Sequence, residues 1–186
     1  MPGERFRRSL PIFALMKRGS SIPVLLCLLV VVASAGCKHE PASSALDSEL
    51  LELARASDGH VWYRFSDSLL PRSPLTGHGE AFLRTRYDPT AAALLDSTGK
   101  VLPDTTFPEG ALIVKELWED QSTLGTYAVL LKRPSEPAAD ANGWVWGYIR
   151  ANGEVRNSAL DKGSACRGCH GQAGSIDASL MNLSFP

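Results

Sequence analysis

The sequence predicts an α+β domain, in which a mainly antiparallel β-sheet is accompanied by a few short helices. Three strand-like segments follow one another at residues 111–118, 125–133 and 144–149, and each is rich in β-branched and aromatic side chains. Short segments with helix-capping residues come before them. Short helices beside a dominant antiparallel sheet define the α+β class.

The first helix is predicted at residues 45–56. Ser44 can cap its N-terminus, and Asp58-Gly59 ends it. Its apolar side chains recur at helical spacing and share one face, which carries Leu46, Leu50, Leu53 and Ala54.

Two more strands are predicted between this helix and the three main strands. They lie at residues 61–65 and 80–87, with a Pro- and Gly-rich connection over residues 70–79 between them. Asp88-Pro89 then predicts a short helix as far as Leu95, because aspartate is a good N-cap and proline favours the first helical position.

The remaining segments are predicted to be connections. Residues 97–110 form a loop, and residues 134–142 form a second loop that is rich in Pro and Ala. Asn152-Gly153 is a turn pair and predicts the tip of a hairpin after the third main strand.

The N-terminus has the features of an export signal at residues 1–36. Basic residues precede an apolar run from Ile22 to Val32, and small residues end it at Cys37. The apolar run is too short for a comfortable membrane span. Small residues directly before a cysteine resemble a lipobox, which predicts acylation of Cys37 and a lipid tether at residues 37–43. Ser34 stands where a lipobox usually has Leu, so export to the periplasm as a soluble protein is the alternative.

The chain after residue 36 is acidic and has the size of one domain, predicted at residues 44–186. Five of the 19 Lys and Arg residues and one of the 20 Asp and Glu residues lie in the signal, which leaves 14 bases and 19 acids. The net charge of −5 argues against binding to nucleic acid and favours a basic electron-transfer partner.

Cys166, Cys169 and His170 form a Cys-x-x-Cys-His motif near the C-terminus. Two thiols at this spacing can each bond to a vinyl group of one haem, and the histidine that follows is then held against the iron as an axial ligand. In an exported chain the motif predicts covalent attachment of one haem c. Half of a zinc site is the alternative, but the sequence lacks the second ligand pair that zinc would need.

The group on the other face of the iron decides between functions, because small electron-transfer cytochromes fill that position with Met or His. Met181 lies in a tail of 16 residues after His170, too short to reach around the ring. His60 and His78 can reach from upstream, but each is interpreted as a surface or structural histidine. The sequence therefore favours an open sixth position on the iron.

Lys115 is the second unusual residue. Strand alternation places it on the same face as Ile113 and Leu117. A lysine between two aliphatic residues either points to solvent or stands at a buried functional site. The residues alone favour solvent, because lysine is rarely buried.

Three segments together resemble the cytochrome P-460 family. They are Pro108-Glu109-Gly110 leading into the strand at residues 113–117, the aromatic strand at residues 143–148, and the Cys-x-x-Cys-His motif with Asp177 seven residues after its histidine. The resemblance covers residues 87–177. It implies a periplasmic mono-haem c protein with a largely β fold, usually a homodimer.

The resemblance also implies an activity. In the hydroxylamine-oxidising members the lysine of this strand is bonded to a meso carbon of the porphyrin, and Lys115 matches that position. A haem-facing Lys115, oxidation of hydroxylamine at an open iron site and electron transfer to another cytochrome are therefore expected. Asp161 and Glu116 are candidates for a distal proton acceptor. The alternatives are nitric oxide binding at a five-coordinate haem, as in the related cytochrome c′-β proteins, and simple electron transfer.

Overall fold

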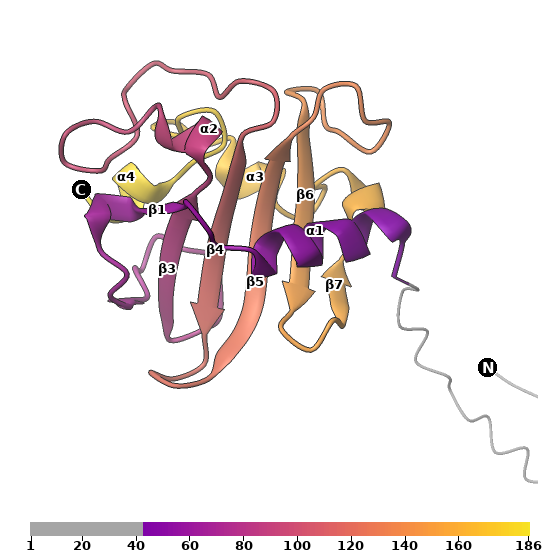
Figure 1. Ribbon diagram of the computed structural model, residues 1–186, viewed down its shortest axis with the longest axis horizontal. Coiled ribbons are helices and arrows are strands. Elements are labelled where there is room, and N and C mark those ends of the chain that lie inside the picture. Colours follow the sequence, from indigo (N-terminus) through magenta and orange to yellow (C-terminus); the bar gives the residue numbers. More distant parts are fainter. Residues whose placement is uncertain (1–42) are drawn as a thin grey trace, which may run out of the picture. The chain divides into compact units, whose positions relative to one another are not determined.

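The structure is a computed structural model and describes residues 43–186. The predicted signal peptide at residues 1–36, Cys37 and nearly all of the predicted tether lie outside the described residues. Within residues 43–186, a seven-stranded antiparallel sheet is accompanied by short helices, which confirms the α+β class (Figure 1). No helix in this part of the chain is long and apolar enough to cross a membrane.

The strands pair in the order β1-β3-β4-β5-β6-β7, and β2 pairs separately with β3. Every pair is antiparallel. The strands are β1 (Val61–Trp62), β2 (Leu70–Pro71), β3 (Phe82–Tyr87), β4 (Leu112–Trp118), β5 (Leu124–Lys132), β6 (Trp144–Arg150) and β7 (Val155–Asn157).

Different segments of the chain pack on the two faces of the sheet. The helix α1 packs on one face, where Leu50, Leu51 and Ala54 contact apolar side chains of β4, β5 and β6. Residues 163–186 cover the other face, and Figure 1 shows α1 in front of the sheet with α3 and α4 behind it. The helical segments are α1 (Ala45–Arg55), α2 (Pro89–Ala92), α3 (Arg167–His170) and α4 (Met181–Ser184), with 3₁₀ turns η1 (Tyr63–Phe65) and η2 (Ala159–Asp161).

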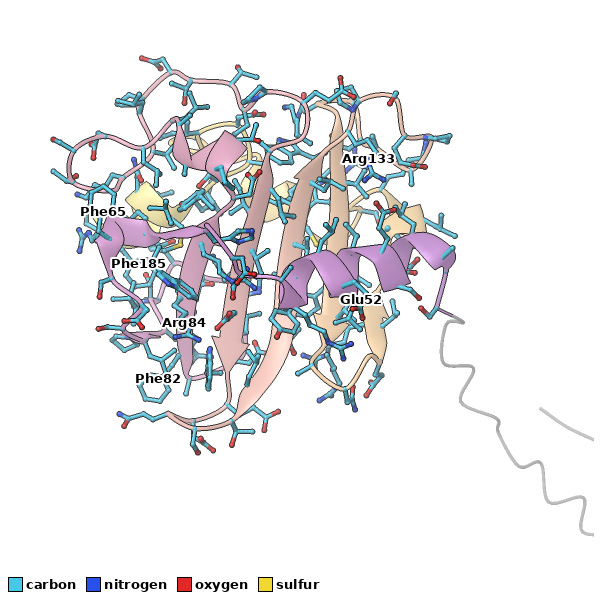
Figure 2. All side chains as sticks on the ribbon, viewed as in Figure 1. Glu52, Phe65, Phe82, Arg84, Arg133 and Phe185 are labelled. Carbon is cyan, nitrogen blue, oxygen red and sulfur yellow. The ribbon has the colours of Figure 1, made fainter. Side chains whose placement is uncertain are left out.

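α1 is fixed at its N-terminus by a capping box, as predicted from Ser44. Ser44 Oγ accepts a hydrogen bond from Asp47 N, and the Asp47 carboxylate accepts one from Ser44 N, both at 3.0 Å. On the surface, Arg133 pairs with Glu49 at 2.6 Å and ties α1 to the end of β5. Figure 2 labels Arg133 on the same side of the sheet as α1. The helix ends at Arg55, one residue before the predicted end.

The predicted strand at residues 61–65 is wrong after its second residue. β1 stops at Trp62, and the chain turns because Arg64 and Phe65 have φ angles of 56° and 55°. Arg64 N donates to Gly99 O at 2.9 Å, and a side chain at Gly99 would collide with the Arg64 backbone. The turn therefore depends on a contact with a distant loop.

The remaining strands and helices differ from the prediction mainly at their ends. The connection at residues 70–79 contains β2, β3 begins at Phe82 instead of residue 80, and α2 ends at Ala92 instead of Leu95. The three main strands are confirmed to within two residues at each end. The hairpin predicted at Asn152-Gly153 is also confirmed, since β6 and β7 pair across it and Gly153 has a φ of 97°.

Candidate haem site

A row of side chains crosses the sheet on the face opposite α1. Lys115 on β4 pairs with Thr85 on β3 and with Ala128 on β5, and Ala128 pairs in turn with Tyr148 on β6. Directly paired residues in an antiparallel sheet point to the same face. The four side chains therefore form one line under the C-terminal segment.

A cavity lies between this row and the C-terminal segment, and we call it the His170 cavity. It consists of two hollows that share much of their lining. The shared residues come from the sheet, from the loop before β3 and from the C-terminal segment, and they are His78, Lys115, Tyr148, Cys166, His170 and Leu180. Cys169 lines the first hollow and Met181 lines the second. The cavity thus joins the predicted haem attachment residues to the predicted lysine.

Lys115 is surrounded by protein, and its remaining exposure is toward the His170 cavity. Burial lowers the pKa of its amine to about 8, an effect that the nearby Cys169 sulfur opposes. The interpretation from the residues alone, that this side chain points to solvent, is wrong. The orientation toward Cys166, Cys169 and His170 agrees with the one that the resemblance implies.

α3 presents the attachment motif as a single helical turn. His170 N donates to Cys166 O at 3.1 Å, so the first cysteine and the histidine lie on one side of this turn. Cys166 and Cys169 are both free thiols, and both line the first hollow. Burial raises the pKa of the Cys166 thiol.

The His170 ring is oriented by one hydrogen bond and one aromatic contact. Its Nδ1 lies 2.7 Å from Ala178 O, a distance at which Nδ1–H donates to the carbonyl. The Trp146 ring contacts it edge to face at 5.2 Å between centroids. Burial lowers the pKa of His170, although the Ala178 carbonyl opposes this effect. With Nδ1 occupied, Nε2 is the nitrogen available to a metal, and metal-bound histidines commonly have this arrangement.

Asp177 holds the segment that supplies the Ala178 carbonyl. Its carboxylate accepts hydrogen bonds from Lys132 Nζ at 2.9 Å, Trp144 Nε1 at 3.0 Å and Phe107 N at 2.8 Å. Asp177 and Ala178 have φ angles of 41° and 70°, which turn the chain back toward His170. The acid that follows the motif by seven residues is therefore a structural anchor for the position of His170, outside the cavity lining.

The residues present fit haem c. Two free cysteines at the attachment spacing and a histidine with a free Nε2 line one cavity. The second hollow adds apolar side chains suited to a porphyrin face, among them Ile113, Ala128 and Leu130. In residues 43–186 no group of three or more His, Cys, Asp or Glu side chains is placed to hold a metal ion by itself.

His78 lies in the His170 cavity, which the sequence analysis did not expect. Its ring stacks on Tyr148 at 5.7 Å between centroids and lies 6.4 Å from the His170 ring. Burial, together with the positive charges of Lys115 and His170, lowers the pKa of His78 to about 3, so the ring is neutral near pH 7. Of the two interpretations given for His78, surface or structural, the surface one is wrong.

The other candidates lie elsewhere or have other partners. His60 Nδ1 is 2.8 Å from Arg86 on the α1 face. Glu116 also faces α1 and pairs with Arg84 at 2.6 Å and Arg86 at 3.2 Å. Asp161 is exposed at η2 and does not line the His170 cavity. These positions contradict the suggestion of Glu116 or Asp161 as a distal proton acceptor.

Met181 is a core residue that borders the second hollow. Its sulfur accepts a hydrogen bond from Thr85 Oγ1 at 3.1 Å, and its side chain is buried. The sequence analysis considered His78 as a possible iron ligand, and the cavity residues that it did not name as candidates are Tyr148, Thr85 and Trp146. Only Tyr148 and Trp146 had a signal, since both belong to the aromatic strand that was singled out.

Comparison with known proteins gives no assignment. No family model, no curated protein and no solved structure matches this chain.

Proposed function

We propose that this protein is an exported mono-haem c-type cytochrome, similar to the cytochrome P-460 family, that oxidises hydroxylamine and passes the electrons to another cytochrome. The observation that supports this most is the shared cavity: Lys115 faces the space into which Cys166, Cys169 and His170 also point. An ordinary electron carrier has no need for a buried lysine at its haem, because burial of lysine is unfavourable without a function.

Each residue of the site would have a distinct role toward the haem. The thiols of Cys166 and Cys169 would form thioethers with the haem, and His170 Nε2 would bind the iron. The haem supplies an iron that can bind a small nitrogen compound and accept its electrons. Lys115 lies on the sheet side of the cavity, where its amine would face a haem held by Cys166 and Cys169. A bond from this nitrogen to a meso carbon would interrupt ring conjugation.

The electrons released from hydroxylamine leave to an oxidised partner cytochrome. Oxidation of hydroxylamine to nitrous oxide releases protons and electrons in equal numbers, so a proton acceptor is also required. Among the residues that line the cavity, Tyr148, His78 and Lys115 carry groups that exchange protons. No lining residue of the described chain is an aspartate or a glutamate.

The lack of a carboxylate among the described lining residues favours a second candidate function. A gas-binding haem protein that captures or senses nitric oxide needs no proton acceptor. The apolar lining of the second hollow, with Ile113, Ala128 and Leu130, suits a small uncharged ligand. The two functions share the haem and differ in whether a nitrogen substrate is turned over.

The test uses the full-length protein expressed with the haem attachment machinery. We expect a mass gain of one haem, a strongly red-shifted ferrous Soret band, and reduction of an added oxidised cytochrome c that depends on hydroxylamine. Nitric oxide binding without this reduction would support the second candidate instead. A sharp six-coordinate spectrum without reaction toward either ligand would leave only an electron carrier.

The role of Lys115 is tested by Lys115→Leu, with Lys100→Leu outside the cavity as the matched control. We expect the red shift to disappear in Lys115→Leu and to persist in the control. Peptide mapping should find the haem joined to a Lys115 peptide in the wild type. An unchanged spectrum together with a haem peptide that lacks Lys115 would contradict the bond.

The proposal includes a location on the periplasmic side of the membrane, with Cys37 as the lipid anchor. The acidic mature chain suits a basic soluble cytochrome as redox partner. A homodimer is the assembly that the resemblance implies.

A further inference from the structure

His78 is carried into the His170 cavity by a hairpin loop. The loop joins β2 to β3, and its base is closed by the hydrogen bond from Arg72 N to Ala81 O at 2.9 Å. Within the loop, the backbone N–H of His78 donates to Thr76 Oγ1 at 3.4 Å. This contact uses the backbone, and the imidazole is directed at the space between the sheet and α3.

The distance between His78 and His170 is the one that a shared metal requires. A metal–nitrogen bond to imidazole is about 2 Å long, and the ring centroid lies about 1 Å beyond the nitrogen, so one metal between two imidazoles separates their centroids by about 6 Å. The two centroids are 6.4 Å apart. Both rings line both hollows of the cavity.

We propose that His78 is the second axial ligand of the haem iron in the resting protein, and that a small molecule reaches the iron by displacing it. This inference rests on the proposed attachment of haem at Cys166 and Cys169, and it is independent of whether hydroxylamine is the substrate. It replaces the open sixth position expected from the sequence with a position that opens on ligand exchange.

The other groups at the cavity are less suited to this position. The Met181 sulfur is buried and bonded to Thr85 Oγ1. The Tyr148 hydroxyl donates toward the Glu80 carboxylate at 3.3 Å. Lys115 is fixed on β4 within the sheet, and the proposed function already assigns its amine to the porphyrin. His78 is the imidazole that faces His170 from a separate element.

Displacement of His78 leaves the sheet intact. The residue lies outside the paired range of β3, which begins at Phe82. Gly77 and Gly79 flank it, and additional atoms at either position would meet open space. Rotation of the loop therefore breaks no strand pairing. Its cost is the stacking of His78 on Tyr148 and the hydrogen bond from Arg72 to Gly79 O, so a ligand that binds iron strongly can compete with His78.

The experiment measures the spin state of the ferric full-length protein by absorption and electron paramagnetic resonance. We expect a low-spin, six-coordinate signal in the wild type, its loss in His78→Ala, and its return when imidazole is added to that variant. Cyanide affinity should rise at least about tenfold in His78→Ala, because the wild type exposes the iron only in the fraction with His78 displaced.

Two control variants separate His78 from the other candidates. Met181→Leu conserves volume, and His60→Ala removes a histidine on the opposite face of the sheet; both should keep the low-spin signal. A high-spin wild type with haem covalently attached overturns the inference and leaves the proposed function standing. A signal that survives in His78→Ala but is lost in Met181→Leu also overturns it. A protein without a haem mass overturns both proposals.

Discussion

Asp177 connects the core of the sheet to the candidate axial ligand. Its carboxylate is bound by Lys132, Trp144 and the Phe107 backbone, and the next residue supplies the carbonyl that orients His170. The side chains of Asp177 and Lys132 are 11% and 7% exposed, so removal of either one leaves a charge without compensation in a poorly hydrated place.

The ion pair between Asp177 and Lys132 can be tested by mutation. Asp177→Ala should lower the free energy of unfolding by about 3 kcal/mol, the usual cost of breaking a buried ion pair. Adding Lys132→Met to the same chain should restore part of that loss, since the unpaired ammonium is then removed. Urea denaturation of the two single variants and the double variant measures the coupling. Asp161→Ala is the exposed control and should change the stability by less than about 0.5 kcal/mol. Purely additive losses would show that the pair is not coupled.

Asp47 gives a second prediction, which depends on pH. Burial alone would raise the pKa of Asp47, but hydrogen bonds from Ala159 N, Ser44 and Ser158 outweigh it and hold the folded-state pKa below its usual value. The stabilisation is fully present above the unfolded-state pKa of about 4 and is lost as the pH falls through the lower folded-state pKa.

Asp47→Ala should therefore destabilise the protein by about 2 kcal/mol at pH 7, and the difference from the wild type should shrink as the pH falls below about 4. Unfolding free energies measured across this range check the prediction. Glu52→Gln, an exposed position on the same helix, serves as the control. A difference that stays constant down to the lowest pH would show that the charge of Asp47 is not involved.

At the scale of the elements, the C-terminal segment reaches its position through a close contact with β6. Gly163 has a φ of 65°, and a Cβ at this position would lie 2.5 Å from the Trp146 ring. Trp146 in turn contacts the His170 ring. The path of the segment before α3 therefore requires glycine, both for its backbone conformation and for space.

Gly163→Ala should destabilise the protein by about 3 kcal/mol, since the left-handed conformation and the collision each add a cost. Trp146 fluorescence should change at the same time. Gly168→Ala is the matched control, because it keeps the attachment motif and its Cβ would meet nothing within 4 Å. Similar stability losses in the two variants would contradict the role of the contact with Trp146.

The same elements show what the sequence could predict. The grouping of Cys166, Cys169 and His170 around one hollow was predictable because it depends on spacing within one turn of chain, and the attachment of haem there stays a prediction. The main strands were predictable because alternation and composition are local signals. The end of β1 at Trp62 was not, since the turn at Arg64 depends on a contact with Gly99, a residue distant in sequence.

The position of His78 was beyond sequence reasoning for a related reason. It lies in a loop without periodicity, and its proximity to His170 follows from the pairing of β2 with β3 and from the cover provided by the C-terminal segment. The orientation of Lys115 toward the His170 cavity was expected only from the family resemblance, and its haem-facing role stays a prediction. The residues alone favoured solvent, because burial of a lysine depends on what packs above its strand.

At the scale of the whole molecule, the charge distribution along the chain separates a basic N-terminal region, the proposed export signal, from an acidic domain. Cys37 marks the boundary. In the full-length protein, Cys37→Ala should abolish incorporation of a radioactive fatty acid and shift the protein from the membrane fraction to the soluble periplasmic fraction. The proposed anchor would depend on acylation, since the apolar run before Cys37 is too short to hold the chain in a bilayer by itself. Label retained in Cys37→Ala would exclude a lipid on that sulfur.

The meeting of Lys115 and Cys166 in one cavity also affects the topology of the chain. A bond from Lys115 to a ring that Cys166 already holds would close a covalent loop of about 50 residues, which by chain entropy would stabilise the folded state by about 4 kcal/mol, as a disulfide of that span does. The proposed lipid and haem attachments would together use the three cysteines after residue 36, which are Cys37, Cys166 and Cys169. The prosthetic group would then also serve as the cross-link that limits the unfolded ensemble of this domain.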